Sequence, residues 1–293
     1  MTLSLVFIFL FGLVAGSFLN AIIYRLFLQE ELYSDSNGRR KQGITVFKGR
    51  SFCPSCKHGL AWFDLIPLLS FALLKGQCRY CKRKISWQYP LVELVTGALF
   101  LLIFNYQFSI FNEFSILQFL KLIYLLTVTS SLIVIFVYDL KHYIIPDTPL
   151  FLAIGMTIGY TLFVWVIENW DLIRNLELGI RNLEPLLNPA GAGILASAFF
   201  FAIYAFSKGT WMGFGDAKLA LLMGLVLGFP GIIVAIFFAF VVGALLSLFL
   251  IFFKKKQWKS QVPFGPFLVL GTFLALFFGA PIVNWYLSMF LPL

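Results

Sequence analysis

The sequence carries little charge. Asp, Glu, Lys and Arg make up only 12% of its 293 residues, while 60% are hydrophobic. A soluble domain has about 25% charged residues. The scarcity of charge here excludes a soluble protein and indicates a chain solvated mostly by lipid. The sequence also predicts no cleavable signal peptide. The first apolar run, from Thr2 to Leu26, is too long for one and lacks a basic start and a small-residue cleavage site. We therefore expect a permanent membrane helix there.

Apolar runs of the length that a bilayer requires, about 20 residues, recur along the chain. They predict eight spanning helices, at residues 3–25, 88–106, 116–138, 147–167, 189–207, 217–229, 231–253 and 264–290. Between the sixth and the seventh, the run Gly228 to Gly231 contains Pro230, which predicts a tight break and a helical hairpin. Because lipid offers no partner for unpaired backbone groups, we expect an all-α integral membrane protein.

The basic residues predict the orientation of the chain. Its net charge is +9, and residues 25–87 hold twelve of the 22 Lys and Arg residues. With the N-terminus outside, nineteen basic residues lie on the cytoplasmic side, as the positive-inside rule requires. The charge then holds cytoplasmic loops against membrane lipid, and we expect no nucleic-acid partner. The predicted regions are a first helix at 1–27, a cytoplasmic insert at 28–87 and a membrane core at 88–293.

Four cysteines lie in the insert as two CxxC pairs separated by 21 residues: Cys53, Cys56, Cys78 and Cys81. Two such pairs predict a tetrahedral zinc site. Since all four ligands are thiolates, the site is closed and therefore structural. Two disulfides are the alternative, which a cytoplasmic location disfavours. His58 is a weaker alternative ligand.

The segment from Trp62 to Leu74, between the two pairs, is apolar but too short to cross a bilayer. We expect it to lie in the membrane interface and to hold the zinc module there. A buried core helix is the alternative. The basic cluster formed by Arg79, Lys82, Arg83 and Lys84 is expected to lie near anionic lipid headgroups.

Acidic residues in or beside apolar spans are costly and usually functional. Four occur here: Glu93, Asp139, Asp147 and Asp216. In the predicted orientation the three aspartates lie at the cytoplasmic face. Asp139 is the strongest candidate, because it ends a helix, where an anion is electrostatically disfavoured. Helix capping is an alternative role for Asp216 and is favoured for Asp147, and a structural pairing is favoured for Glu93.

Two close carboxylates can share a proton and hydrolyse a peptide bond. The ionised one takes a proton from the attacking water, and the protonated one polarises the carbonyl. Gly213 and Gly215, just before Asp216, would let the backbone approach an extended peptide. Asp147 and Lys218 are candidates for binding the substrate or supporting the site.

Four sequence blocks resemble the bacterial type IV prepilin peptidase (leader peptidase/N-methyltransferase) family. They are Gly16–Arg25, the cysteine insert with Asp64–Ser70 inside it, Ile85–Leu94, and the Asp139 motif with Gly213–Asp216. Together they cover nearly the whole chain in order. The resemblance implies an enzyme of the bacterial cytoplasmic membrane, with Asp139 and Asp216 as the catalytic aspartates.

The resemblance also implies substrates and a methyl donor. Members of the family cut the basic leader of prepilins and pseudopilins after a glycine, and many then methylate the new N-terminus with S-adenosylmethionine. The sequence shows no glycine-rich loop for the donor, and Asn20, Arg25 and Glu93 are only weak candidates for binding it. Two alternatives are a GxGD protease that cuts transmembrane substrates and a non-enzymatic transporter or scaffold.

Overall fold

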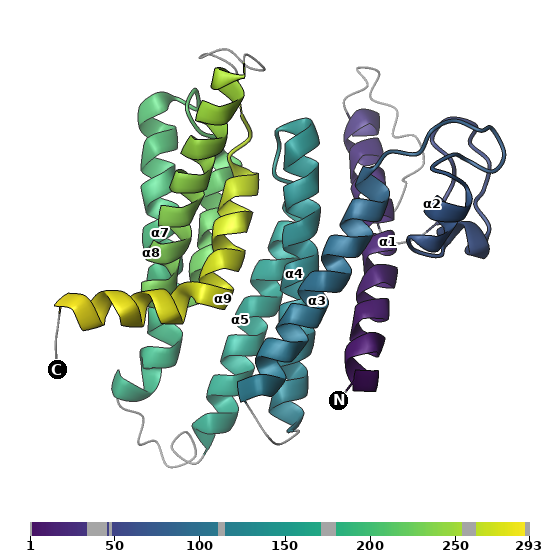
Figure 1. Ribbon diagram of the computed structural model, residues 1–293. Helices are drawn as coiled ribbons and strands as arrows, with labels where there is room; N and C mark the ends of the chain where they lie inside the picture. Colours follow the sequence, from purple (N-terminus) through teal and green to yellow (C-terminus); the bar gives the residue numbers. More distant parts are fainter. Residues whose placement is uncertain are drawn as a thin grey trace. The chain divides into compact units, whose positions relative to one another are not determined.

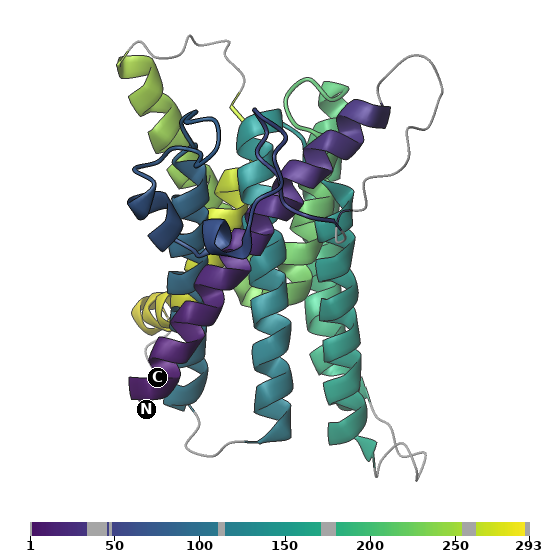
Figure 2. The same ribbon diagram turned by 90° about the vertical axis from the view of Figure 1, so that its right-hand side faces the viewer.

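The computed structural model describes residues 2–33, 46, 49–110, 115–170, 180–253 and 262–290. Much of the N-terminal half of the predicted insert, residues 34–45 and 47–48, therefore lies outside the described residues. Helices dominate what is described (Figures 1 and 2). Within this part of the chain, β structure is limited to two isolated bridges, which confirms the all-α prediction. The chain forms two compact units, residues 1–134 and 135–293.

Unit 1 pairs two long helices, α1 and α3, and the insert joins them in the sequence. It contains α1 (Thr2–Tyr33), the 3-10 helix η1 (Trp62–Leu65), α2 (Leu69–Leu73), α3 (Gln88–Ile110) and the larger part of α4 (Ile116–His142). Glycines let α1 and α3 approach closely, because a Cβ on Gly12 or Gly16 would lie only 2.7 Å from the Cα of Gly97 or Glu93. Such small-residue contacts are typical of helices that pack within a membrane.

Unit 2 takes the last turns of α4 and all later elements. These are α5 (Asp147–Glu168), η2 (Ile180–Leu183), α7 (Glu184–Ser207), α8 (Phe214–Phe252) and α9 (Gly265–Phe290). Helix α8 packs on both α7 and α9 through glycines. A Cβ on Gly224 would overlap the backbone of Gly193 in α7, and one on Gly271 of α9 would overlap the carbonyl oxygen of Ala235. The core of unit 2 is therefore built around α8.

Helix α8 is broken near its middle, where the sequence predicts the hairpin turn. Gly228 (φ 60°, ψ −172°) and Phe229 (φ −87°, ψ 141°) leave the helical region. Asn188 of α7 spans this break: its Oδ1 accepts the Phe229 N–H at 2.6 Å, and its Nδ2 donates to the Phe229 carbonyl at 3.3 Å. One side chain thus satisfies backbone groups that the interrupted helix leaves unpaired.

The two arms of α8 fold back on each other. Ile145 contacts both Gly215, near the start of α8, and Gly265, at the start of α9. Further along, Phe267 of α9 lies against Gly243 in the second arm of α8. Both ends of α8 therefore lie at the same end of unit 2, as Figures 1 and 2 show.

Seven helices among the described residues are long and apolar enough to cross a membrane, so the chain is a multi-pass membrane protein. The sequence predicted eight. The difference lies in α8, which counts once by length although its backbone breaks at Gly228 and Phe229. Helix α1 also runs to Tyr33, beyond the predicted end of the first spanning region at residue 27.

Candidate active site and metal centre

Asp139 lies in the last turn of α4 and is buried. The backbone N–H of Gly265 donates a hydrogen bond to its carboxylate. The approach is close enough that a Cβ at position 265 would lie 2.5 Å from Asp139 Oδ2, so any side chain there would have to displace the carboxylate. Glycine at the start of α9 is therefore a condition for the position of this carboxylate.

Asp216 lies in the first turn of α8 and is also buried. Its Oδ2 accepts a hydrogen bond of 3.1 Å from the backbone N–H of Gly213, and its own N–H donates to the Gly213 carbonyl at 3.2 Å. This is how an acid in a first helical turn caps the preceding backbone. Asp216 is therefore not the N-cap residue itself but the third residue of α8, bonded back to Gly213 just before the helix, and this leaves its second carboxylate oxygen outside that bond.

The two aspartates come together in unit 2. They are close enough for their charges to act on each other. The side chain of Ile145 lies against both Gly215, next to Asp216, and Gly265, which binds Asp139. A Cβ at Gly215 would meet Ile145 Cβ at 3.0 Å, so this glycine lets α8 pack closely against Ile145. Sequence reasoning missed Ile145 and Gly265, since neither carries a local signal of its role.

Asp147 does not cap α5, contrary to the favoured reading of its role. Pro146 occupies the N-cap position, and no side-chain cap is made. Instead Asp147 forms an ion pair with Lys218 of α8, in which Lys218 Nζ donates a hydrogen bond of 2.7 Å to Asp147 Oδ1. The two residues predicted to support the site therefore interact with each other, across α5 and α8.

The three weak cofactor candidates lie in unit 1, and all are buried and hydrogen-bonded. Glu93 Oε2 accepts the N–H of Leu68 at 2.9 Å, with the Ser17 hydroxyl also in reach. Asn20 donates to the Tyr89 carbonyl at 3.1 Å. Arg25 donates to the carbonyls of Val46 (3.1 Å) and Gly49 (2.7 Å). Glu93 and Arg25 thus hold the insert against the helices, and the pairing predicted for Glu93 is made with a backbone group instead of a basic side chain.

The four cysteines form one cluster in the insert. Their Sγ atoms all lie within 4.8 Å of one another, and Cys53 and Cys81 Sγ are 3.9 Å apart. A tetrahedral zinc ion with Zn–S bonds of about 2.3 Å separates its sulfurs by about 3.8 Å. The donor set and its spacing therefore fit zinc, and His58 lies outside the cluster, stacked on Tyr80 with 3.8 Å between ring centroids.

The two CxxC turns have the same backbone geometry. In the first, Cys53 N–H bonds the His58 carbonyl at 2.9 Å and Lys57 N–H bonds the Cys53 carbonyl at 2.9 Å. In the second, Cys78 N–H bonds the Arg83 carbonyl at 2.8 Å and Lys82 N–H bonds the Cys78 carbonyl at 3.0 Å. Each turn is closed by one isolated bridge. The thiol positions are therefore set by two matching local turns.

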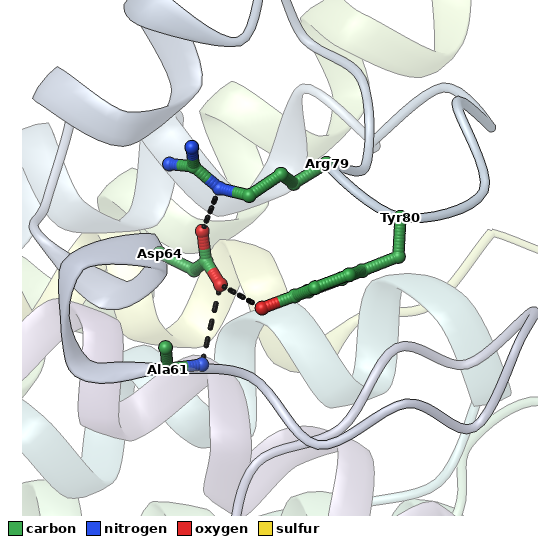
Figure 3. Close-up of polar contacts among 4 residues, drawn as sticks. All are labelled: Ala61, Asp64, Arg79 and Tyr80. Carbon is green, nitrogen blue, oxygen red and sulfur yellow. Dashed lines mark hydrogen bonds and ion pairs between the residues drawn. The ribbon is translucent and has the colours of Figure 1, made fainter.

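Asp64 joins η1 to the second CxxC turn (Figure 3). It accepts hydrogen bonds from Arg79 Nε (2.7 Å), the Tyr80 hydroxyl (3.1 Å) and the Ala61 N–H (3.2 Å). Burial alone raises the pKa of Asp64, but these hydrogen bonds, that of Arg79 first, outweigh it, so the pKa is lowered. The ionised carboxylate thus ties the apolar segment to the cysteine cluster.

The apolar segment between the cysteine pairs is not a buried core helix. Neither η1 nor α2 contains a buried residue. Trp62 is 77% exposed and Leu73 is 72% exposed, with Leu69 also on the surface. The alternative of a core helix is therefore wrong, and a large apolar surface remains open beside the metal centre.

Comparison with known proteins agrees with these features. Residues 10–107 match the Bacterial Peptidase A24 N-terminal domain, and residues 126–248 match the Type IV leader peptidase family. Relatives named "Prepilin leader peptidase/N-methyltransferase" are 32% identical in Legionella pneumophila (95% of this chain, 93% of the relative) and 29% identical in Bacillus subtilis (96% and 97%). One from Aeromonas hydrophila is 31% identical, over 97% of this chain and 94% of its own. No solved structure matches the chain.

The apolar helices define a polytopic membrane protein, and the two buried aspartates at helix ends are its candidate site. The matches extend over nearly the full length of both chains. The chain therefore belongs to the type IV leader peptidase family.

Proposed function

We propose that the chain cleaves the basic leader peptide of type IV prepilins and pseudopilins after a glycine, and methylates the new N-terminus. Asp139 and Asp216 are the proposed catalytic residues. The observation that carries the proposal is their convergence: two buried carboxylates from α4 and α8, each held by a glycine N–H, whose charges act on each other.

The proposed cleavage uses one proton shared by the pair, because two adjacent carboxylates do not both ionise readily. The ionised carboxylate takes a proton from water, and the water oxygen attacks the carbonyl carbon of the glycine that ends the leader. The protonated carboxyl donates a hydrogen bond to the carbonyl oxygen. As the intermediate collapses, the C–N bond breaks and the leaving amine takes a proton from the pair.

The methylation half of the proposal rests on the relatives' names. S-adenosylmethionine would supply a methyl group to the amine that cleavage frees. The side chains first considered for holding the donor, Asn20, Arg25 and Glu93, are engaged with the chain itself. They do not fit a donor site as they stand, since binding through them would break the contacts that hold the insert.

We propose that Cys53, Cys56, Cys78 and Cys81 hold a structural zinc ion. Their sulfurs would bind it as four thiolates, which leaves no open position for catalysis. Around it, the exposed apolar residues Trp62, Leu69 and Leu73 would enter the membrane interface. The basic cluster that includes Arg79 and Lys82 would then face anionic headgroups.

We further propose eight crossings in a bacterial cytoplasmic membrane, with the N-terminus outside and the site at the cytoplasmic face. The proposed regions are the membrane-spanning part of the first helix at residues 1–27, the cytoplasmic insert at 28–87, into which α1 continues as far as Tyr33, and the membrane core at 88–293. The contacts of Ile145 with Gly215 and Gly265 support this topology. If α8 crossed only once, its two ends would lie on opposite faces, and those contacts could not form together.

A cleavage assay on membranes tests the dyad. We expect Asp139→Asn and Asp216→Asn each to lower cleavage of a prepilin substrate by about 10²–10⁴-fold, because each removes a proton-transferring group. Glu168→Gln is the matched control, an exposed acid at the far end of α5. N-terminal mass analysis of the product follows methylation. Full cleavage by either aspartate variant would refute the dyad, and an inert parent would refute the proposed function.

A further inference from the structure

A small cation-binding box lies beside the proposed dyad, and the protein's own Lys218 fills it. Helix α5 presents Asp147 and Phe151, which are one turn apart, and α8 presents Phe214 and Lys218, also one turn apart. Lys218 Nζ lies 2.7 Å from Asp147 Oδ1, 5.1 Å from the centroid of the Phe214 ring and 5.6 Å from that of Phe151. A carboxylate and two aromatic rings around an ammonium form a receptor for a cation.

The side chains that form the box are exposed at the protein surface. The Asp147 side chain is 58% exposed, while that of Lys218 is only 26% exposed. Phe151 and Phe214 are 56% and 46% exposed. The receptor groups are thus more accessible than the lysine they hold. Exposed ion pairs contribute little to folding stability. Another cation could therefore replace Lys218 at Asp147 with little loss of stability.

The box adjoins the site through the chain. Lys218 follows Asp216 by two residues in α8, and Asp147 follows Ile145, the residue that contacts Gly215 and Gly265, by two residues. A peptide lying across the dyad would therefore pass the box. A cationic side chain of that peptide is the ligand whose chemistry matches a carboxylate with aromatic walls.

We propose that Asp147, Phe151 and Phe214 bind a Lys or Arg side chain of the leader, and that Lys218 occupies this subsite until the leader displaces it. The inference rests on the proposed function for the identity of the ligand. It assigns Asp147 the role of a specificity-determining residue. It assigns Lys218 the role of an internal competitor.

A purely structural ion pair between α5 and α8 is the competing explanation. The two explanations predict opposite effects of removing Lys218 on leader binding. If the pair only clamps the helices, removing either partner weakens the site. If Lys218 competes with the leader, Asp147→Asn weakens leader binding, whereas Lys218→Met strengthens it. Methionine retains most of the length and the apolar stem of lysine, so packing beside the two rings is kept.

The experiment measures equilibrium binding of a synthetic basic leader peptide to the full-length protein in phosphatidylcholine nanodiscs. A second peptide carries glutamine in place of every Lys and Arg. Phosphatidylcholine has no net charge, which keeps the basic peptide from binding to the membrane itself. Lys208→Met, an exposed lysine at the end of α7, is the matched control and is expected to change neither affinity. Cleavage by the parent protein is scored separately, so failure of the proposed function is seen independently.

For the basic peptide, we expect Asp147→Asn to weaken binding about tenfold, since a charge-assisted hydrogen bond is lost. We expect Lys218→Met to strengthen it by up to about fivefold. The glutamine peptide should be insensitive to both changes. Weaker binding in Lys218→Met, an equal loss for both peptides in Asp147→Asn, or no detectable binding of the basic peptide would each overturn the inference.

Discussion

Both units bury carboxylates at helix positions, but they satisfy them differently. In unit 1, Glu93 accepts the Leu68 N–H and has the Ser17 hydroxyl in reach, so it joins two parts of the fold. In unit 2, Asp139 and Asp216 each receive one backbone N–H, from Gly265 and Gly213, and each acts on the charge of the other. A buried acid shared between structural partners stabilises a fold. One placed near a second acid is a candidate for chemistry.

The largest expected effect is loss of zinc, which we expect to disorder the insert and to leave unit 2 unchanged. Replacing Cys53 and Cys78 together by serine should abolish zinc binding, whose apparent free energy in small domains is about 10–16 kcal/mol. Zinc content is measured by elemental mass spectrometry. The order of the backbone in the insert and in unit 2 is measured by amide hydrogen exchange. We expect faster exchange over residues 49–87 with unchanged protection in α7 to α9.

Ser55→Ala, inside the first CxxC turn, is the control and should retain zinc. A purified parent protein without zinc would contradict the metal assignment. Loss of protection throughout unit 2 in the cysteine variant would contradict the independence of the two regions.

The next effect concerns the support of Asp139. Gly265→Ala should lower cleavage about 10²-fold, because the new methyl group must displace the Asp139 carboxylate and a misplacement of about 1 Å has that cost. Gly155→Ala in α5 is the matched control, since a Cβ there meets nothing within 4 Å. Equal activity of the two variants would show that the Gly265 contact does not position the dyad.

A smaller effect is expected at Glu93. Glu93→Leu leaves the Leu68 N–H without its acceptor, which costs about 1–3 kcal/mol, whereas Glu93→Gln keeps an acceptor oxygen. Hydrogen exchange of residues 62–74 should rise clearly in the leucine variant and only slightly in the glutamine variant. If both variants instead lose cleavage as the aspartate variants do, Glu93 belongs to the chemistry and the comparison between the units fails.

The smallest effect is expected at Asn188. Asn188→Ala removes two hydrogen bonds at the break in α8, and side-chain bonds between membrane helices average about 0.6 kcal/mol each. Thermal unfolding in detergent should shift slightly, and Asn188→Asp, which keeps the acceptor for the Phe229 N–H, should shift less. An unchanged midpoint in Asn188→Ala would show that the break needs no side-chain support.

The sequence predicted the features that have local signals. The cysteine spacing predicted the cluster, apolar length predicted the spans, and Gly228 with Pro230 predicted the break. The position of Asp139 at a helix end was also predicted locally, from the end of the apolar run that precedes it.

Features made by long-range contacts were not predicted. Gly265 lies 126 positions after Asp139, and only the folded chain brings them together. Asp147 was expected to cap α5, but Pro146 takes the cap position and Lys218, from another helix, binds the carboxylate. Pairing between distant helices depends on how they pack, which composition and periodicity do not encode.

The break in α8 also bears on the surrounding lipid. Its first arm, Phe214 to Leu227, has 14 residues, which at 1.5 Å each gives about 21 Å of helix. Hydrocarbon is about 30 Å thick, so the turn at Gly228 ends short of the opposite headgroups. The arm is about 9 Å shorter than that, but it is enclosed by its neighbours, since Leu219, Leu222 and Met223 are fully buried. Asn188 of α7 binds the turn from the side, so we expect lipid at that depth to meet α7 instead of the end of a short helix.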